Sequence, residues 1–274
     1  MAVWINGELL PDNEALISVF DHGVVVGDGA FETVKVASGR PFALSRHLAR
    51  LASSAAGLGL RAPDLDQISA GAAAVIKASP RVPLARMRIT ITGGIGPLGS
   101  ERGKSALTAV VALAEQRAPA DYVDVAVVPW SRNEFGALVG LKTTSYAENV
   151  RALGYAAERD TGEAIFANTA GNLCEGTGTN VFVVVGGKLV TPPLSAGCLA
   201  GVTRALVLEW VGGAEEDLPV DALAAADEAF LTGTTREVQP IRKVNGFKLA
   251  AVPGPVTRKA AEVFGTRAAE SPDP

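Results

Sequence analysis

The sequence predicts a mixed α/β fold, of the α+β class, in two domains. Segments with strand-like apolar patterns alternate with segments of helical spacing along the whole chain. Residues 117–121 are polar, contain proline and precede a new strand pattern, which is typical of a linker. We therefore expect an N-terminal α/β domain at 1–116 and a C-terminal domain at 122–274, and the 274 residues suffice for both.

In the first domain, the segment from Val3 to Leu9 places an Asn-Gly turn between apolar residues and predicts a hairpin. A helix is expected from Ser45, a residue type that caps helix N-termini, because apolar side chains recur at helical spacing through Leu58. The other elements expected here are strands at 31–37, 87–92 and 106–113 and a helix at 66–78.

The second domain continues the alternation of strands and helices. The strands are expected at 123–129, 163–167, 180–185 and 228–232. The helices are expected at 147–159, from 201 onward, and at 256–269. The last four residues, Ser-Pro-Asp-Pro, are expected to fray.

Charge and cysteine content exclude several classes of protein. Lys and Arg number 25 against 29 Asp and Glu, a net charge of −4, so no basic stripe is available for a nucleic-acid backbone. The N-terminus lacks a cationic start, and the apolar runs are too short to span a bilayer. Cys174 and Cys198 lack CxxC spacing and neighbouring histidines, which argues against a disulfide scaffold or a metal site. We expect an unexported cytoplasmic protein that binds neither nucleic acid nor membrane.

The segment Gly94 to Gly99 matches GxGxxG and follows a strand pattern. However, Pro97 lies inside it, and the residues that follow lead into another strand pattern. A dinucleotide site needs a helix N-terminus at this point to hold the pyrophosphate. Nucleotide binding is therefore not expected.

Two other segments could hold an anion. Gly201-Val202-Thr203 precedes a strongly helical stretch, so amides at the helix start and a threonine hydroxyl could cradle a phosphate; the alternative is a glycine turn with a threonine cap. The segment from Thr232 to Arg236 ends a strand with small hydrogen-bonding residues, and could present amides to an anion or simply turn the chain.

Three charged residues each allow two interpretations, one structural and one functional. Lys142 closes the apolar run 137–141 and precedes a string of hydroxyl side chains, but surface lysines are the commonest kind. Arg50 lies off the leucine stripe of its helix, so its guanidinium either faces solvent or matches phosphate oxygens. Glu175 lies between apolar strand patterns, where it is either exposed in a turn or buried with a partner.

Taken together, these segments resemble the fold-type IV pyridoxal-5′-phosphate enzymes, the class IV aminotransferase family. The resemblance covers nearly the whole chain, and it rests on the order and spacing of several motifs together. The motifs are GDGAFETVKV from Gly27, His47-x-x-Arg50-Leu51, Leu141-Lys142-Thr-x-x-Tyr146, AGNLCEGTGTNVF from Ala170, Gly201-Val-Thr-Arg204 and LTGTTREVxP from Leu231. The resemblance implies a smaller N-terminal domain, a larger C-terminal domain with pyridoxal 5′-phosphate between them, and homodimers.

The resemblance also implies roles for single residues. Lys142 forms the Schiff base with the cofactor aldehyde and later shuttles the substrate proton, which needs an amine whose pKa is lowered by burial and by the cationic cofactor ring. Glu175 pairs with the pyridine nitrogen, so that the ring acts as an electron sink. Tyr146 hydrogen-bonds the phenolic oxygen. The cofactor phosphate is held by Arg50, Val202, Thr203, Thr234 and Thr235.

The resemblance leaves the reaction open between two kinds. Leu98 and Ser100 stand where D-amino acid transaminases carry an Arg-x-His pair for the substrate carboxylate. The form Phe31-Glu32-Thr33 differs from the FEG of branched-chain enzymes and resembles 4-amino-4-deoxychorismate lyases, in which a threonine at the Thr33 position assists pyruvate elimination; threonine is also a good strand former.

We therefore expect a 4-amino-4-deoxychorismate lyase of folate biosynthesis in which Lys142 and Thr33 are catalytic. The alternative is a transaminase of D-amino acids or branched-chain amino acids that uses a 2-keto acid as acceptor. The substrate is in either case a small molecule. Its expected contacts are Phe31, Arg86 and Arg88; the two arginines alternate on a strand and so share one face, which either binds the carboxylate or faces solvent.

Overall fold

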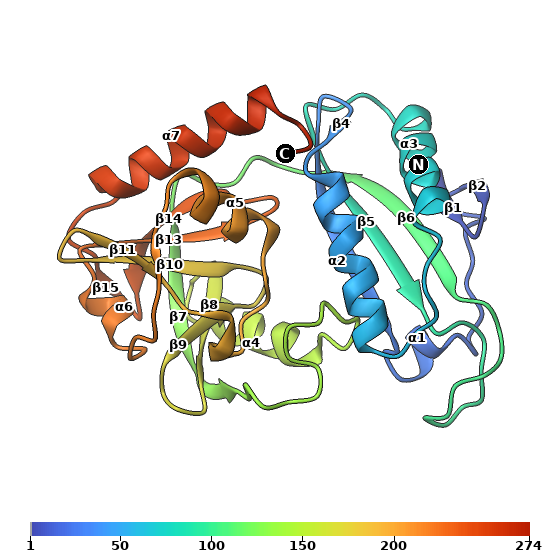
Figure 1. The fold of residues 1–274 in the computed structure, drawn as a ribbon, viewed down its shortest axis with the longest axis horizontal. Coiled ribbons are helices and arrows are strands. Elements are labelled where there is room, and N and C mark those ends of the chain that lie inside the picture. The colour runs from blue at the N-terminus through green and yellow to red at the C-terminus, as the bar shows by residue number, and fades with distance from the viewer. Residues whose placement is uncertain (1) are drawn as a thin grey trace. The chain divides into compact units, whose positions relative to one another are not determined.

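The computed structural model describes residues 2–274, which form two compact units (Figure 1). Unit 1 runs to Arg117 and includes the separate segments Leu141–Tyr146 and Pro272–Pro274. Unit 2 comprises Ala118–Gly140 and Ala147–Ser271. The change of unit after Arg117 falls in the expected linker. The expected second domain, in contrast, is not continuous, because the Lys142 segment and the C-terminal residues pack with unit 1.

Unit 1 contains an antiparallel six-stranded sheet in the order β2-β1-β6-β5-β3-β4. Its elements are β1 (Ala2–Ile5), β2 (Glu8–Pro11), α1 (His22–Val25), β3 (Gly29–Ala37), β4 (Arg40–Pro41), α2 (Leu44–Gly57), α3 (Leu65–Ala78), β5 (Leu84–Thr92) and β6 (Thr108–Glu115). The loop between β5 and β6 contains the GxGxxG segment and leads into a strand, as the sequence predicts.

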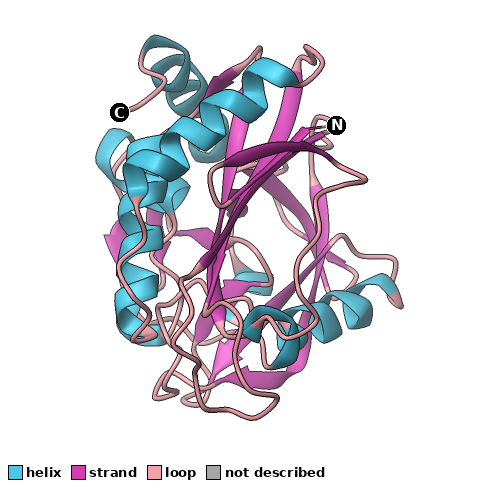
Figure 2. Ribbon diagram, turned by 90° about the vertical axis from the view of Figure 1, so that its right-hand side faces the viewer, coloured by secondary structure: helices cyan, strands magenta, loops and turns pink. Residues whose placement is uncertain are grey.

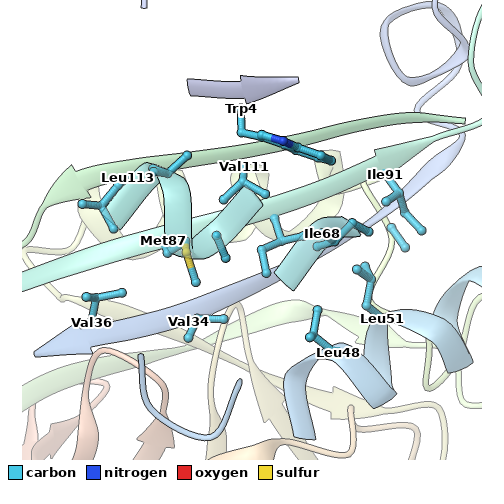
Figure 3. Packing of buried hydrophobic residues seen from close by; sticks show 14 of the residues in the cluster. Trp4, Val34, Val36, Leu48, Leu51, Ile68, Met87, Ile91, Val111 and Leu113 are labelled. Carbon is cyan, nitrogen blue, oxygen red and sulfur yellow. The ribbon is translucent and has the colours of Figure 1, made fainter. Parts of the chain in front are cut away.

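The core of unit 1 lies between this sheet and the helices α2 and α3. Leu48 and Leu51 of α2 and Ile68 of α3 point toward Val34, Met87 and Val111 of the sheet (Figure 3). These helices bury one apolar stripe each, which is why the helical spacing of their apolar residues predicts them.

Strand β3 separates two environments by the alternation of its side chains. Ala30 and Val34 belong to the core beneath α2, and Glu32 contacts residues of α2. Phe31 and Thr33 therefore point to the opposite face of the sheet, where Thr33 pairs with Arg88 of β5. The candidate site residues Phe31 and Thr33 thus alternate along β3 with residues that pack against α2.

The start of α2 differs from the sequence prediction. The N-cap is Ala43, in the left-handed conformation with φ of 53°, and not Ser45. Ser45 instead bonds the carboxylate of Asp273 through its N–H, at 3.0 Å, and through its hydroxyl. The C-terminal residues are therefore bound to α2, and the expectation that they fray is wrong.

Unit 2 is built on a nine-stranded mixed sheet in the order β12-β11-β10-β13-β14-β7-β8-β9, with β15 paired to β14. The strands are drawn as twisted arrows in Figure 2. Those of unit 2 are β7 (Val123–Arg132), β8 (Glu163–Asn168), β9 (Leu173–Gly176), β10 (Asn180–Val185), β11 (Lys188–Thr191), β12 (Ala214–Glu215), β13 (Glu228–Gly233), β14 (Glu237–Val244) and β15 (Phe247–Lys248). Its helices are α4 (Ala147–Ala157), the 3-10 turn η1 (Leu194–Ala196), α5 (Val202–Trp210), α6 (Ala222–Ala225) and α7 (Pro255–Glu270).

Buried residues cover both faces of this sheet. One cluster includes Val125, Ile165, Val183 and Leu231. A second cluster joins Phe166 and other residues of β7 and β8 to the small side chains of α4. Because the central strands are buried on both faces, they read in the sequence as continuous apolar runs.

The predicted mixed α/β class is confirmed, and the predicted helices and strands recur with shifts of one to a few residues at their ends. Within residues 2–274 no helix combines the length and apolar character needed to cross a membrane. Cys174 and Cys198 are both buried as free thiols.

Candidate active site

The Lys142 segment is held against the start of β3 by backbone hydrogen bonds. The Phe31 N–H donates to the Lys142 carbonyl at 3.0 Å, and the Thr144 N–H donates to the Gly29 carbonyl at 2.8 Å. Ala30 and Thr143 form an antiparallel bridge between these bonds. The segment therefore runs beside β3 like one more short strand, although it lies more than a hundred residues away in the sequence.

Lys142 is only 8% exposed, so it is not a solvated surface lysine, which was the alternative interpretation of the sequence. Its Nζ lies 3.4 Å from the Tyr146 hydroxyl oxygen and 4.4 Å from the centre of the Phe31 ring. The two rings meet edge to face with centres 5.0 Å apart. The structure thus brings Lys142, Tyr146 and Phe31 together and places the amine against aromatic surface.

Arg88 reaches the same ring from β5. Its guanidinium carbon lies 3.3 Å from the Phe31 ring centre, and its Nε donates to the Thr90 hydroxyl at 3.1 Å. Arg88 is exposed, yet packing around its guanidinium lowers the pKa of Arg88 to about 10, so it remains charged at pH 7. A guanidinium and an amine therefore contact one phenylalanine ring, an arrangement that suits an anionic ligand.

Arg86 lies farther along β5 on the face of Arg88, where it pairs with Lys35 of β3. It is exposed. Both arginines thus occupy the face that carries Thr33 and Phe31, and the contact with the Phe31 ring singles out Arg88.

Arg50 is tied to the opposite side of β3. Its Nε and Nη2 donate to the two carboxylate oxygens of Glu32, at 2.8 and 2.7 Å, and His47 Nδ1 lies 2.7 Å from the same carboxylate. Glu32 is fully buried. Burial by itself would raise the pKa of Glu32, but the hydrogen bonds from Arg50 and His47 outweigh it and lower the pKa to about 2. The expected phosphate ligand Arg50 is therefore fixed in orientation by a buried carboxylate.

In unit 2, Glu175 lies on β9 and is held at both oxygens. Its Oε2 accepts a hydrogen bond of 2.9 Å from the Leu199 N–H, and its Oε1 lies 3.4 Å from Arg132 Nε. The carboxylate that the sequence singles out is thus partly buried beside a positive charge and a backbone donor, as a buried carboxylate requires.

Arg132 is a residue that the sequence reasoning missed. Its guanidinium lies 4.2 Å from the Phe166 ring centre, and it bonds Glu148 and Asn149 at the start of α4. Its position at the end of a strand is the only signal that the sequence offers, because contact with Glu175 depends on the pairing of β7 with β8 and of β8 with β9.

The turn before α5 connects Glu175 to a helix N-terminus. Leu199, whose N–H bonds Glu175, gives its carbonyl to the Asn180 side-chain amide at 2.8 Å. A Cβ added to Gly201 would lie 2.0 Å from Asn180 Oδ1, so glycine is required there. The helix begins at Val202 and Thr203, whose amides precede the first helical hydrogen bond and are available to an anion.

The second anion-binding candidate is the turn between β13 and β14. The Arg236 N–H donates to the Gly233 carbonyl at 3.1 Å, which makes Thr234 and Thr235 the central residues of a β-turn. Thr232, which precedes this turn, pairs with Asn180 across β10 and β13. Its hydroxyl is buried and has no hydrogen-bond partner among the described residues.

These groups fit the phosphate and ring of pyridoxal 5′-phosphate. The donors at the start of α5 and in the 233–236 turn are amides and threonine hydroxyls, the set that holds a phosphate. The buried, unpartnered hydroxyl of Thr232 lies next to this set. In unit 2, the partly buried carboxylate of Glu175 is a group that can pair with a ring nitrogen. In unit 1, Lys142 has a buried amine, a group that can bind an aldehyde.

The family model of class IV amino-transferases matches residues 29–244 of this chain. The chain is 31% identical to a Methanocaldococcus jannaschii protein that is provisionally named as a branched-chain-amino-acid aminotransferase, over 96% of this chain and 95% of that protein. It is 29% identical to a D-alanine aminotransferase of Staphylococcus haemolyticus, over 96% of each. It is 28% identical to the aminodeoxychorismate lyase of Bacillus subtilis, over 93% of this chain and 90% of that enzyme.

Among solved structures, the branched-chain aminotransferase of Thermoproteus uzoniensis with norvaline superposes with a TM-score of 0.90 at 30% identity, covering 97% of this chain and 93% of that one. The relatives carry three different activities in their names, so the comparison fixes the family and leaves the substrate open. The chain belongs to the class IV aminotransferases, a family of pyridoxal-phosphate-dependent enzymes.

Proposed function

We propose that this class IV enzyme is a 4-amino-4-deoxychorismate lyase, which releases pyruvate and 4-aminobenzoate. The observation that carries the proposal is the position of Thr33. Its side chain shares a face of β3 with Phe31, whose ring the Lys142 amine contacts at 4.4 Å, and it pairs with Arg88. A hydroxyl and a guanidinium thus accompany the lysine on one face of unit 1.

We propose that Lys142 binds the cofactor covalently and that Tyr146 hydrogen-bonds its phenolic oxygen. Glu175 holds the ring nitrogen. The phosphate is held by Arg50, the amides of Val202 and Thr203, and the turn residues Thr234 and Thr235. The amides of Val202 and Thr203, which precede the first helical hydrogen bond of α5, support the phosphate part of this assignment.

When bound, the cofactor supplies an electron sink for the substrate carbon that bears the amino group. Once the substrate amino group had displaced Lys142 from the cofactor, the freed Nζ would accept the proton from that carbon, and the neighbouring carbon–oxygen bond to the enolpyruvyl group would break with its electron pair on oxygen. Thr33 donates a proton to the methylene carbon of the departing enolate, which becomes pyruvate, and the proton held by Lys142 restores the hydroxyl. The ring is left aromatic, so no second substrate is consumed.

In this proposal Arg88 binds a carboxylate of the substrate. The Phe31 ring excludes water from one side of the guanidinium, which strengthens a charge-assisted hydrogen bond to an anion. The Arg88 guanidinium and the Lys142 amine both contact the Phe31 ring, so the proposed carboxylate ligand and the proposed catalytic amine are neighbours at one aromatic side chain.

The test is pyruvate release from 4-amino-4-deoxychorismate by the purified, cofactor-loaded protein without added keto acid. Sustained release is expected. Replacing Thr33 by Val keeps the shape and removes the hydroxyl, and should lower pyruvate release by at least about 10²-fold with unchanged cofactor loading. Thr266→Val, at an exposed position of α7, is the matched control. A Thr33→Val protein as active as wild type would remove Thr33 from the reaction.

The relatives named as branched-chain and D-alanine aminotransferases favour a second candidate, a transaminase of D-amino or branched-chain amino acids. In that reaction Lys142 returns the proton to the cofactor side, and the amino group passes to a 2-keto acid. Keto-acid-dependent turnover of D-alanine or leucine, with no pyruvate release from 4-amino-4-deoxychorismate, would establish this candidate in place of the lyase.

We also propose that the partner of this chain is a second copy of itself. Unit 1 exposes a group of apolar side chains on two segments that hydrogen bonds join, from His22 N–H to the Gly94 carbonyl and from Gly96 N–H to the Phe20 carbonyl. The group includes Leu16, Val19, Phe20, Val24, Ile95 and Leu98. An apolar patch of this kind marks an interaction surface. Light scattering should give a dimer for the wild type and a monomer for Val19→Asp with Val24→Asp, whereas Phe247→Asp in unit 2 should remain dimeric.

A further inference from the structure

Helix α2 carries a stripe of polar residues that two different parts of unit 1 contact. His47, Arg50 and Ser54 are spaced by three and four residues and so share one helix face. The first two bind the Glu32 carboxylate of β3. Ser54, 1% exposed, accepts a hydrogen bond of 3.1 Å from the Lys142 N–H through its hydroxyl. One helix face therefore fixes both β3 and the backbone of the candidate catalytic lysine.

The last residue of α2 makes a second contact with the same segment. A Cβ added to Gly57 would lie 2.5 Å from Leu141 Cδ2 and 3.0 Å from its Cδ1. Glycine leaves room here for the end of the Leu141 side chain, which would have to shift if a methyl group were added. Ser54 and Gly57 thus meet consecutive residues, Lys142 through a hydrogen bond and Leu141 through a packed surface.

We propose that Ser54 and Gly57 are positioning residues for Lys142, and that α2 sets the place of the lysine relative to Arg50. The proposal rests on the proposed cofactor-binding roles of Lys142 and Arg50. Arg50 and Ser54 are four residues apart, about 6 Å along the helix axis. The residue proposed for the cofactor phosphate and the residue that holds the lysine backbone are therefore spaced by one turn of a single helix.

The experiment measures capture of Lys142 by pyridoxal 5′-phosphate. Apo-protein is mixed with the cofactor, samples are reduced with borohydride at intervals, and the modified Lys142 peptide is quantified by mass spectrometry. Ser54→Ala should slow capture by about tenfold or more, since it removes the hydrogen bond to the Lys142 N–H. Gly57→Ala should slow capture to a smaller extent, since it displaces the side chain of the neighbouring Leu141. Thermal unfolding of every apo-variant is recorded, and capture is measured well below the lowest midpoint.

Matched controls separate positioning from general damage to a helix. Ser53→Ala removes a hydroxyl from the next residue, which is exposed and bonds the Ala49 carbonyl within α2. Gly265→Ala adds a methyl group to another helix, α7, where it meets open space. Both variants should be captured at the wild-type rate.

A rescue variant makes the test sharper. Leu141→Ala combined with Gly57→Ala removes the side chain against which the new methyl group collides, and should restore capture to the rate of Leu141→Ala alone. If Ser54→Ala and Gly57→Ala fold and are captured as fast as wild type, or if the double variant is slower than both single ones, the positioning role is wrong. If wild-type Lys142 is itself not captured, the proposed function fails instead.

Discussion

The two units hold their candidate site residues in different ways. In unit 1, a buried side-chain network is prominent: Glu32 fixes Arg50 and His47, and Ser54 accepts a hydrogen bond from the Lys142 N–H, in addition to the backbone hydrogen bonds that hold the Lys142 segment to β3. In unit 2, backbone amides supply more of the contacts: the Leu199 N–H holds one oxygen of Glu175, with Arg132 beside the other, and the anion-binding candidates are the start of α5 and a β-turn.

This difference determines which substitutions each unit tolerates. A site held by a buried ionised network depends on the charge of single side chains, because a buried charge that loses its partner is costly. A site built from amides depends on the path of the chain, and is disturbed where a glycine or an asparagine shapes that path. The following predictions test this contrast, in order of decreasing effect.

Lys142→Ala should have the largest effect. The variant is expected to lose the lysine-linked chromophore, and the rate of pyruvate release or transamination should fall by about 10³-fold or more, because both the covalent and the proton-transfer roles are lost. The visible spectrum of the cofactor-treated protein and the initial rate measure this. Lys77→Ala, on the exposed face of α3, should match wild type. A persisting lysine-linked chromophore in the Lys142→Ala protein would show that another lysine binds the cofactor.

Glu32→Gln should be the most destabilising change in the network of unit 1. Removing one partner of a buried ion pair costs about 3–5 kcal/mol of unfolding free energy at pH 7, because Arg50 and His47 lose their carboxylate. Urea unfolding measures the loss, and Glu262→Gln on the exposed side of α7 is the control. A loss no larger than that of the control would mean that the network contributes nothing to stability.

The pH dependence of the same pair gives a second test. Because the pKa of Glu32 is lowered from 4.5 to about 2 in the folded state, its contribution of about 3 kcal/mol is complete above pH 4.5 and is lost as the pH falls toward 2. The difference in unfolding free energy between wild type and Glu32→Gln should therefore shrink over that range. A difference that stays constant down to the lowest pH at which the protein folds would contradict this pKa.

Glu175→Gln in unit 2 should leave the fold and the cofactor content nearly unchanged and lower turnover by about 10²-fold. The amide keeps the shape of the carboxylate and can still accept the Leu199 N–H, but it brings no charge to the ring nitrogen. Cofactor content by absorbance, kcat and the unfolding midpoint distinguish these effects. Glu158→Gln on the surface is the control. Unchanged turnover would remove Glu175 from the mechanism.

Gly201→Ala tests the dependence of unit 2 on the path of its backbone. The new methyl group would meet Asn180 at 2.0 Å, so the turn before α5 must shift, at a cost of about 1–3 kcal/mol. The affinity for inorganic phosphate and for pyridoxal 5′-phosphate should fall with it. Gly178→Ala meets open space and should bind both as wild type does. Equal affinities for the two variants would show that the cradle at α5 is not shaped by Gly201.

Many helices and strands of the fold could be predicted from the sequence, because they depend on local patterns. The apolar spacing of α2 and the continuous apolar runs of β10 and β13 are visible without any partner segment. The capping prediction at Ser45 failed because the cap depends on the left-handed Ala43 and on Asp273, which is distant in sequence.

The site was only partly within reach. Motif resemblance singled out Lys142, Glu175 and Arg50, and the structure shows each of them in a defined environment. The motif resemblance did not reveal that the Lys142 segment packs with unit 1, because this packing depends on the bridge between Thr143 and Ala30. Arg132 was missed for the same reason, because its contact with Glu175 crosses three strands. Pairings between distant segments carry no local signal.

The alternation along β3 has a consequence for changing this enzyme. Positions 31 and 33 present side chains to the face proposed for the reaction, whereas the side chain at position 32 bonds α2 on the other face. A mutant library that varies positions 31 and 33 and keeps Glu32 would therefore explore new substrates with little loss of folded protein. Randomising all three positions would instead discard most of the library before selection, because folding and selectivity are encoded in neighbouring residues of one strand.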